Sequence, residues 1–132
     1  MAAASNYLEE AILNYFFRGQ TVQQPSELYL ALYINDPTDN DTGSEIRGAG
    51  YQRQKIRFDA PTQVGDKGSI VNSETVEFPI AEGDWGQISH WAVRTAASGG
   101  QMLTRGAFSR LETIKEGNKF IIEKGNLQIT ME

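Results

Sequence analysis

The chain contains no cysteine and a single histidine, His90. Without cysteine it has no disulfide framework, no thiolate nucleophile and no cysteine-based zinc site. A hydrolytic triad needs a base placed between a nucleophile and an acid, and here only His90 is available as a histidine base. The neighbouring Ser89 should point to the opposite face of the strand predicted around His90. We therefore expect no catalytic pair, and we expect that the protein is not an enzyme.

Long apolar runs and concentrations of positive charge are also missing. No stretch approaches the ~20 apolar residues of a membrane-spanning helix, and residues 1–10 lack the basic and apolar regions of a signal peptide. The net charge is −5 and the basic residues are scattered, which argues against binding to a nucleic acid duplex or a membrane surface. We expect a protein that is made in a cytoplasm and binds neither nucleic acid nor membrane.

Length and composition predict one folded domain. The 132 residues fall in the usual size range of a single domain, and the balance of 39% apolar and 22% charged residues is typical of folded chains. No repeat of fixed period and no low-complexity segment is present in the sequence. We expect residues 1–132 to share one hydrophobic core.

One segment, residues 6–18, has the periodicity of an α-helix. Its apolar side chains recur at helical spacing and form a broad stripe. Asn6 and Glu9 have the spacing of a capping box, and Gly19 follows the last helical residue as a stop signal. We expect this helix to cover the strand that follows it or to pack between subunits.

The rest of the chain has the pattern of short strands separated by turns. The clearest strand is residues 27–35, in which leucines alternate with tyrosines and alanine, so that both faces are apolar and both need a cover. Weaker alternation predicts further strands at residues 51–58, 70–78, 85–95, 101–108, 119–123 and 127–131, and a turn-rich connection at 60–69. This pattern predicts a mainly β fold: an antiparallel, jelly-roll-like β-sandwich or a barrel over residues 27–131, with the N-terminal α-helix packed on it.

Residues 36–50 form a long polar loop, and a loop of this length in a short chain is often functional. Its carboxylates, at Asp36, Asp39, Asp41 and Glu45, are of the type that calcium takes as ligands. Their spacing does not match an EF-hand, and aspartate is a common turn residue. We therefore favour a solvated loop without metal or other cofactor, and keep its three aspartates as candidates for contact with a partner.

Large aromatic and arginine side chains are stronger candidates for protein contacts, and the sequence offers Tyr51, Trp85, Trp91 and Arg105. Two interpretations stay open for the tryptophans, contact with a partner or filling of the core, and Trp85 at a strand entrance is suited to plug a corner. Exposed tryptophans beside acidic loops also suit a carbohydrate-binding module. A hydrolase that uses His90 is the least favoured alternative.

Six segments spread over nearly the whole chain carry a resemblance to a known family. They are NYLEEAILNYFFRG at 6–19, LYLALYINDPTDNDTGSEI at 28–46, GYQRQKIRF at 50–58, FPIAEGDWGQISHWAV at 78–93, GGQMLTRGAF at 99–108 and EGNKFIIEKGNLQI at 116–129. The pattern resembles small bacteriophage virion proteins of about this length, which are often described as tail fibre proteins and in some phages as head decoration (cement) proteins.

The resemblance implies a structural, non-enzymatic protein of the virion. Its expected partners are the major capsid protein or other virion proteins, and we expect it to form a homo-oligomer. A compact chain without a fibrous repeat favours capsid decoration over a tail fibre, baseplate or receptor-binding component. The expected location is the virion, after synthesis in the host cytoplasm, and a carbohydrate-binding module is the competing class of function.

Overall fold

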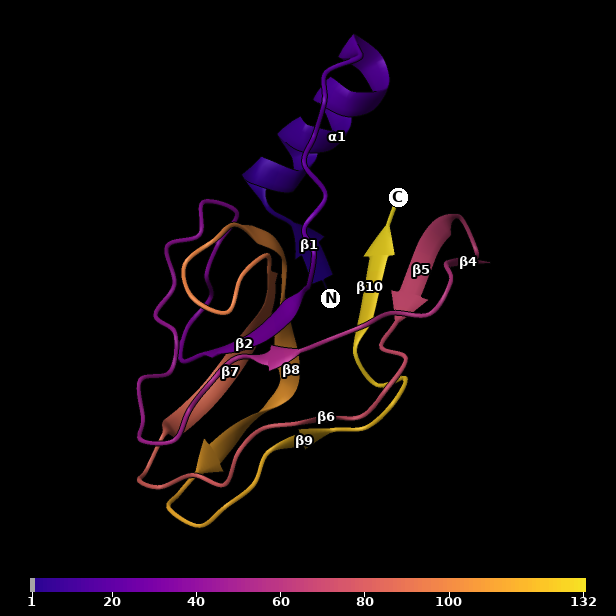
Figure 1. Ribbon diagram of the computed structural model, residues 1–132. Helices are drawn as coiled ribbons and strands as arrows, with labels where there is room; N and C mark the ends of the chain where they lie inside the picture. The colour runs from indigo at the N-terminus through magenta and orange to yellow at the C-terminus, as the bar shows by residue number, and fades with distance from the viewer. Residues whose placement is uncertain (1) are drawn as a thin grey trace.

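The computed structural model describes residues 2–132 and consists of antiparallel sheets with one helix (Figure 1). The elements in chain order are β1 (Ala2–Ala4), α1 (Asn6–Arg18), β2 (Tyr29–Tyr33), β3 (Gln54–Lys55), β4 (Thr62–Val64), β5 (Lys67–Val71), β6 (Val76–Glu77), β7 (Gly86–Arg94), β8 (Met102–Ile114), β9 (Ile121–Ile122) and β10 (Gln128–Met131). The predicted fold class, a mainly β sandwich-like body with an N-terminal helix, is confirmed.

Two sheets enclose the main core. The larger has the strand order β1-β8-β7-β2-β3, the smaller has the order β10-β5-β4, and the short pair β6-β9 lies below them (Figure 1). Leu30 and Val93 of the larger sheet share one apolar cluster with Ile129 and Ile70 of the smaller sheet. Because these side chains come from strands far apart in the sequence, burial of their apolar surface holds the two sheets together.

The alternation predicted for the first strand is present in β2. Leu30 and Leu32 lie in the main core, whereas Ala31 and Tyr33 lie in a second small cluster on the other face. The helix does not cover that second face as we expected, since no residue of α1 is buried and α1 contacts β8 and β1. The reason is the sheet order: β1, which leads into α1, pairs with β8, and β8 and β7 together separate β1 from β2.

The helix occupies the predicted residues, but its first cap differs from the prediction. Ser5 is the N-cap, and its Oγ accepts a hydrogen bond from the Leu8 N–H at 3.1 Å. Ser5 thus holds the N-cap position that we expected for Asn6, and Asn6 is the first helical residue. Gly19 ends the helix in the left-handed conformation with φ 67°, as predicted. No helix of residues 2–132 has the length and apolar character needed to cross a membrane.

The alternation along β7 is interrupted at Ser89. Strict alternation would place Ile88 and His90 on one face and Trp91 on the other, but Ile88 lies in the same core cluster as Trp91 and Val93. The pairing of β7 with β8 shifts between Ile88 and His90, so the side-chain phase changes there. As a result Ser89 Oγ and His90 Nδ1 are 2.7 Å apart, and the prediction that they point to opposite faces is wrong.

A hairpin occupies part of the segment expected to be a turn-rich connection. It consists of β4 and β5, joined at Gly65, whose φ is 64°. All three residues of β4 are exposed, so the sequence of this strand lacks the apolar alternation that would predict it. The alanine strand β1 was missed because alanine is a weak strand former, and β8 continues beyond the predicted end at residue 108.

Both tryptophans are core residues. Trp85 lies against Gly48 and donates its Nε1–H to the Ala49 carbonyl oxygen at 2.8 Å, while the ring of Trp91 lies against Gly106. Both side chains are almost completely buried. Their rings therefore fill the body of this chain, and the exposed tryptophans that a carbohydrate-binding module would use are not present at these positions.

The contact between Trp91 and Gly106 predicts a large effect of a single methyl group. In Gly106→Ala the new Cβ would overlap the Trp91 ring, so we expect the free energy of unfolding to fall by about 1–3 kcal/mol in urea titration. The control is Gly68→Ala in β5, where a Cβ meets only ordinary contacts. Equal stability of the two variants would contradict the close packing at Gly106.

Candidate functional site

Arg94, at the end of β7, connects three parts of the chain. Its Nη1 and Nη2 donate to the two carboxylate oxygens of Asp41 at 2.7 and 2.9 Å, and Nη1 also donates to Tyr33 Oη at 3.0 Å. Its Nε and Nη2 donate to the carbonyl oxygens of Gly99 and Gly100 in the turn before β8. All five N–H groups of the nearly buried guanidinium are thereby satisfied, which fixes the loop 36–50 against the β7–β8 turn.

Glu45 is the centre of a second polar contact of the same loop. Arg53 Nε and Nη2 each donate to one of its oxygens at 2.8 Å, and the Tyr51 hydroxyl donates at 2.6 Å. Burial by itself raises the pKa of Glu45, but the hydrogen bonds from Arg53 and Tyr51 and the Arg53 charge outweigh it and hold the pKa below its ordinary value. Burial first, and then the hydrogen bond to Glu45, raise the pKa of Tyr51.

Arg105 of β8 pairs with the other two carboxylates of the loop. Its Nη1 lies 3.0 Å from Asp36 Oδ1, and its Nη2 lies 2.8 Å from Asp39 Oδ1. Together with the Arg94 contact to Asp41, this gives each aspartate of the loop an arginine partner, while much of the loop is still exposed to solvent. In the part of the chain that the structure describes, no group of three or more acidic or histidine side chains is arranged to hold a metal ion.

The base of α1 is attached to this loop and to β8. The backbone N–H of Asn6 donates to the Asp39 carbonyl oxygen at 3.0 Å. The backbone N–H of Ser5 donates to the Leu103 carbonyl oxygen at 2.9 Å, and Ser5 Oγ donates to the Met102 carbonyl oxygen. The start of the helix is therefore fixed by the Ser5 cap and by hydrogen bonds to β8, with one further hydrogen bond to the loop that the arginines hold.

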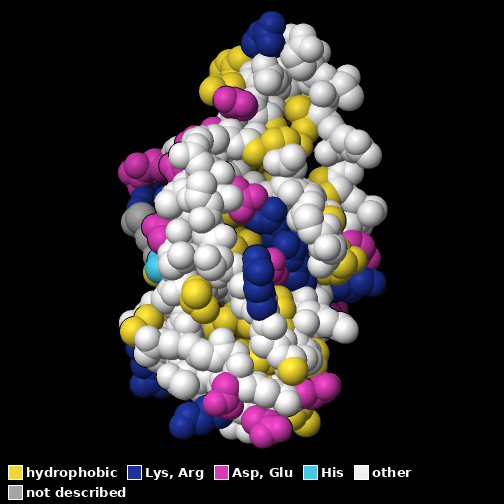
Figure 2. Space-filling model, turned by 90° about the vertical axis from the view of Figure 1, so that its left-hand side faces the viewer, with side chains coloured by type: hydrophobic (Ala, Val, Ile, Leu, Met, Phe, Trp, Pro, Cys, Tyr) yellow, Lys and Arg dark blue, Asp and Glu magenta, His cyan; other side chains and the backbone are white. Residues whose placement is uncertain are grey.

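Beyond its base, α1 projects from the body (Figure 1), and eight of its 13 residues are apolar. Its exposed side chains include Leu13 at 55%, Phe16 at 73% and Phe17 at 77% of full exposure. Hydrophobic side chains are visible around the projecting end of the molecule in Figure 2. A helix with this pattern is usually buried, and a contiguous exposed apolar surface marks an interaction site.

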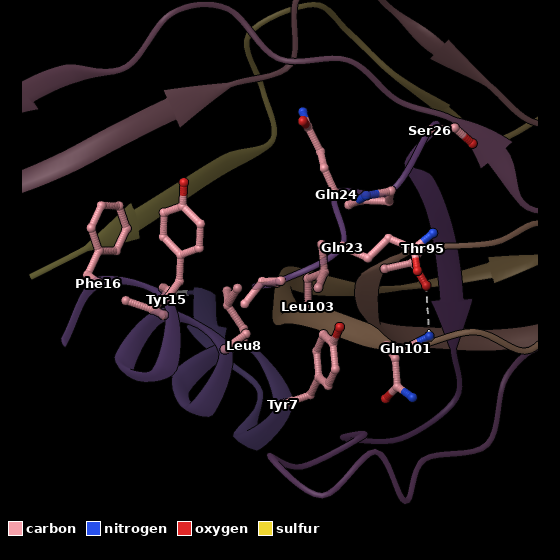
Figure 3. Close-up of a pocket in the computed structure, with 14 residues that line it drawn as sticks. Tyr7, Leu8, Tyr15, Phe16, Gln23, Gln24, Ser26, Thr95, Gln101 and Leu103 are labelled. Atoms are coloured by element: carbon pink, nitrogen blue, oxygen red, sulfur yellow. Dashed lines mark hydrogen bonds between the residues drawn. The ribbon is translucent and has the colours of Figure 1, made fainter. Parts of the chain in front are cut away.

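A groove of about 710 Å³ lies between α1 and the segment that returns to β2. Figure 3 shows Tyr7, Leu8 and Tyr15 pointing from the helix toward this segment, residues 22–26, with Leu103 of β8 at the base. Apolar atoms make up most of the lining. We refer to α1 together with this groove as the helix site.

The contact residues predicted from the sequence lie elsewhere and have partners within the chain. The Tyr51 ring lies parallel to Phe78 at 6.2 Å and edge-on to Trp85 at 5.5 Å, and Arg105 holds the loop. The exposed aromatic rings are those of α1, which we had not singled out. The signal in the sequence was a helix with more apolar residues than one buried face requires.

The Ser89–His90 contact does not by itself form a hydrolytic site. A triad also needs an acidic group that orients the histidine, and no carboxylate of residues 2–132 is hydrogen-bonded to His90. The expectation that the protein is not an enzyme therefore stays a prediction.

Comparison with known families gives a match over almost the whole chain. The family described as Podophage GP4 fiber I protein gp80 matches residues 3–130. The chain belongs to this family. No curated protein matches it as a relative. Membership of the family confirms the predicted resemblance to phage virion proteins, and the protein is a structural protein of a phage virion.

The geometry at Arg94 predicts that lysine cannot replace it. Arg94→Lys keeps the charge but loses the two-pronged contact with Asp41 and the bonds to the turn, so we expect the free energy of unfolding to fall by about 3 kcal/mol. Arg57→Lys is the control, since the Arg57 side chain is 58% exposed in its pair with Glu27. Chemical denaturation of both variants measures the difference, and a similar small effect in each would contradict a structural role of Arg94.

The lowered pKa of Glu45 predicts a loss of stability in acid. Because the pKa is lower in the folded chain than in the unfolded chain, the contribution of Glu45 is fully present above its ordinary value of 4.5 and disappears as the pH falls through the folded pKa. Denaturation between about pH 6 and 3 should therefore show a shallower pH dependence for Glu45→Gln than for the wild type. The exposed Glu116→Gln is the control, and an unchanged slope in Glu45→Gln would refute the prediction.

Proposed function

We propose that the protein is a structural component of a virion fibre and that the helix site joins it to other virion proteins. The observation that carries the proposal is a helix with exposed aromatic rings that projects from a firmly attached base. The description of the family as a fibre protein supports a fibre in preference to the capsid decoration that we favoured from the sequence. The role needs no catalysis, and it fits synthesis in the host cytoplasm before assembly.

Exposure of the helix site is unfavourable in the free protein. Burial of apolar surface contributes about 25 cal/mol per Å², so covering Phe16 and Phe17 in an assembly stabilises the assembled state by several kcal/mol. Aromatic side chains are also the residues that dominate binding energy at protein interfaces. The aromatics of the body are already packed in its core, so the helix site is the surface best suited to a virion partner.

Incorporation into particles tests this proposal. Phe16→Ser/Phe17→Ser should leave the thermal unfolding of the protein nearly unchanged, because neither side chain is buried, but should strongly reduce its amount in purified virions measured by mass spectrometry. Val64→Ser, at an exposed site on β4, is the control and should be incorporated normally.

Immunogold labelling of the same virions locates the protein. Label on fibres is expected, whereas label spread over the head would support capsid decoration. Normal incorporation of Phe16→Ser/Phe17→Ser would show that the helix site is not the attachment surface.

A further inference from the structure

The helix has a second apolar face that points away from the groove. Leu13 and Phe17, four residues apart, lie next to each other on the helix surface, and neither lines the groove. Phe16 lies at the border between this face and the groove, which it also lines, and its ring stands edge-on to Tyr15 with the centroids 4.9 Å apart. We call the surface formed by Leu13, Phe16 and Phe17 the outer face; the exposed Glu9 lies beside Leu13, one turn earlier in the helix.

A polar stripe runs along one flank of the outer face. Glu10, Asn14 and Arg18 follow one another at intervals of four residues, so they lie on the same side of the helix. Asn14 Oδ1 accepts a hydrogen bond from Arg18 Nη1 at 3.0 Å, which keeps the guanidinium on this stripe. The stripe is therefore negative at one end, neutral in the middle and positive at the other end.

Two such stripes have complementary charges when the two helices run in opposite directions. If two copies of α1 lie antiparallel with a two-fold axis at the level of Asn14, Glu10 of each copy faces Arg18 of the other. Parallel helices would instead place Glu10 beside Glu10. The antiparallel arrangement also sets opposite ends of the helix dipoles next to each other.

We infer that the outer face binds a second copy of this chain through an antiparallel pair of α1 helices. The inference rests on the proposed function, because it assigns an occupant to one face of the helix site. With a two-fold axis at Asn14 and a rise of 1.5 Å per residue, side chains of the two copies alternate along the pair. Leu13 of one copy lies between Phe17 and Leu13 of the other. The apolar side chains thus interdigitate while the two polar stripes pair.

The area available agrees with a dimer of modest affinity. With about 200 Å² for each aromatic side chain, the exposed parts of Phe16 and Phe17 with Leu13 give roughly 380 Å² per copy, or roughly 760 Å² for two copies. This is below the ~1,000 Å² expected of a specific interface, so the polar stripes must supply the remaining contact area and the pair is expected to be weak.

Charge reversal tests the pairing directly. Sedimentation equilibrium should show a monomer–dimer equilibrium for the wild type. Glu10→Arg should raise the dissociation constant about tenfold, because it places like charges together at both ends of the pair. The double variant Glu10→Arg/Arg18→Glu should restore the wild-type constant, since it only reverses the stripe. Glu74→Arg, at an exposed position in the body, is the control and should have no effect.

A failure of this inference can be distinguished from a failure of the proposed function. A wild-type chain that stays monomeric, or a double variant as weak as Glu10→Arg, would overturn the self-association. In that event, loss of Phe16→Ser/Phe17→Ser from virions would still support attachment of the helix site to a different virion protein. Circular dichroism confirms that each variant is folded, which is expected because α1 has no buried residue.

Discussion

The pairing of arginines with the carboxylates of loop 36–50 is the constraint on which the rest of the structure depends. Arg94 and Arg105 lie on the two longest strands of the body, and their partners in the loop lie far from them in the sequence. The loop has no strand of its own in its polar middle, so these charged contacts take the place of a hydrogen-bonded ladder. Because both arginines are held by strands, the loop acquires the fixed geometry of the sheet.

The same contacts explain why α1 projects from the body. The face of β2 that carries Ala31 and Tyr33 is apolar and needs a cover, and the sequence suggested the helix. In the structure the loop and the β7–β8 turn provide that cover, with Arg94 bonded to the Tyr33 hydroxyl between them. The helix therefore does not cover β2, and side chains such as Phe16 and Phe17 stay exposed and available to a partner.

Local patterns in the sequence predicted local structure well. The bounds of α1, the alternation of β2 and the corner position of Trp85 all follow from residues close together in the chain. Features without an apolar pattern were missed, such as the exposed strand β4 and the alanine strand β1. These strands are specified by their pairing with a neighbour, and strand pairing is not visible in the residues of one strand.

The candidate site was harder to predict because it depends on which residues are already occupied. Tyr51 and Arg105 are suitable contact residues by type, but a hydrogen bond to Glu45 of the preceding loop and a long-range ion pair with Asp39 engage them inside the chain. Single-sequence reasoning has no access to such pairs. The change of phase at Ser89 is of the same kind, because the shift in pairing arises from the partner strand β8.

The body and the helix differ in how their side chains are covered: among residues 2–132, Thr104 Oγ1 is the one buried side-chain polar atom without a hydrogen-bond partner. In the body, buried polar groups such as Asn72 have partners: its side chain donates to the Glu74 and Glu123 carbonyl oxygens and accepts from the Leu127 N–H. In α1 polar side chains such as Arg18 and Asn14 also have hydrogen-bond partners, but the aromatic side chains face water. A helix held at its base by hydrogen bonds to β8 and to loop 36–50 loses little conformational freedom when a partner covers it, and that makes apolar contacts along it more effective in assembly.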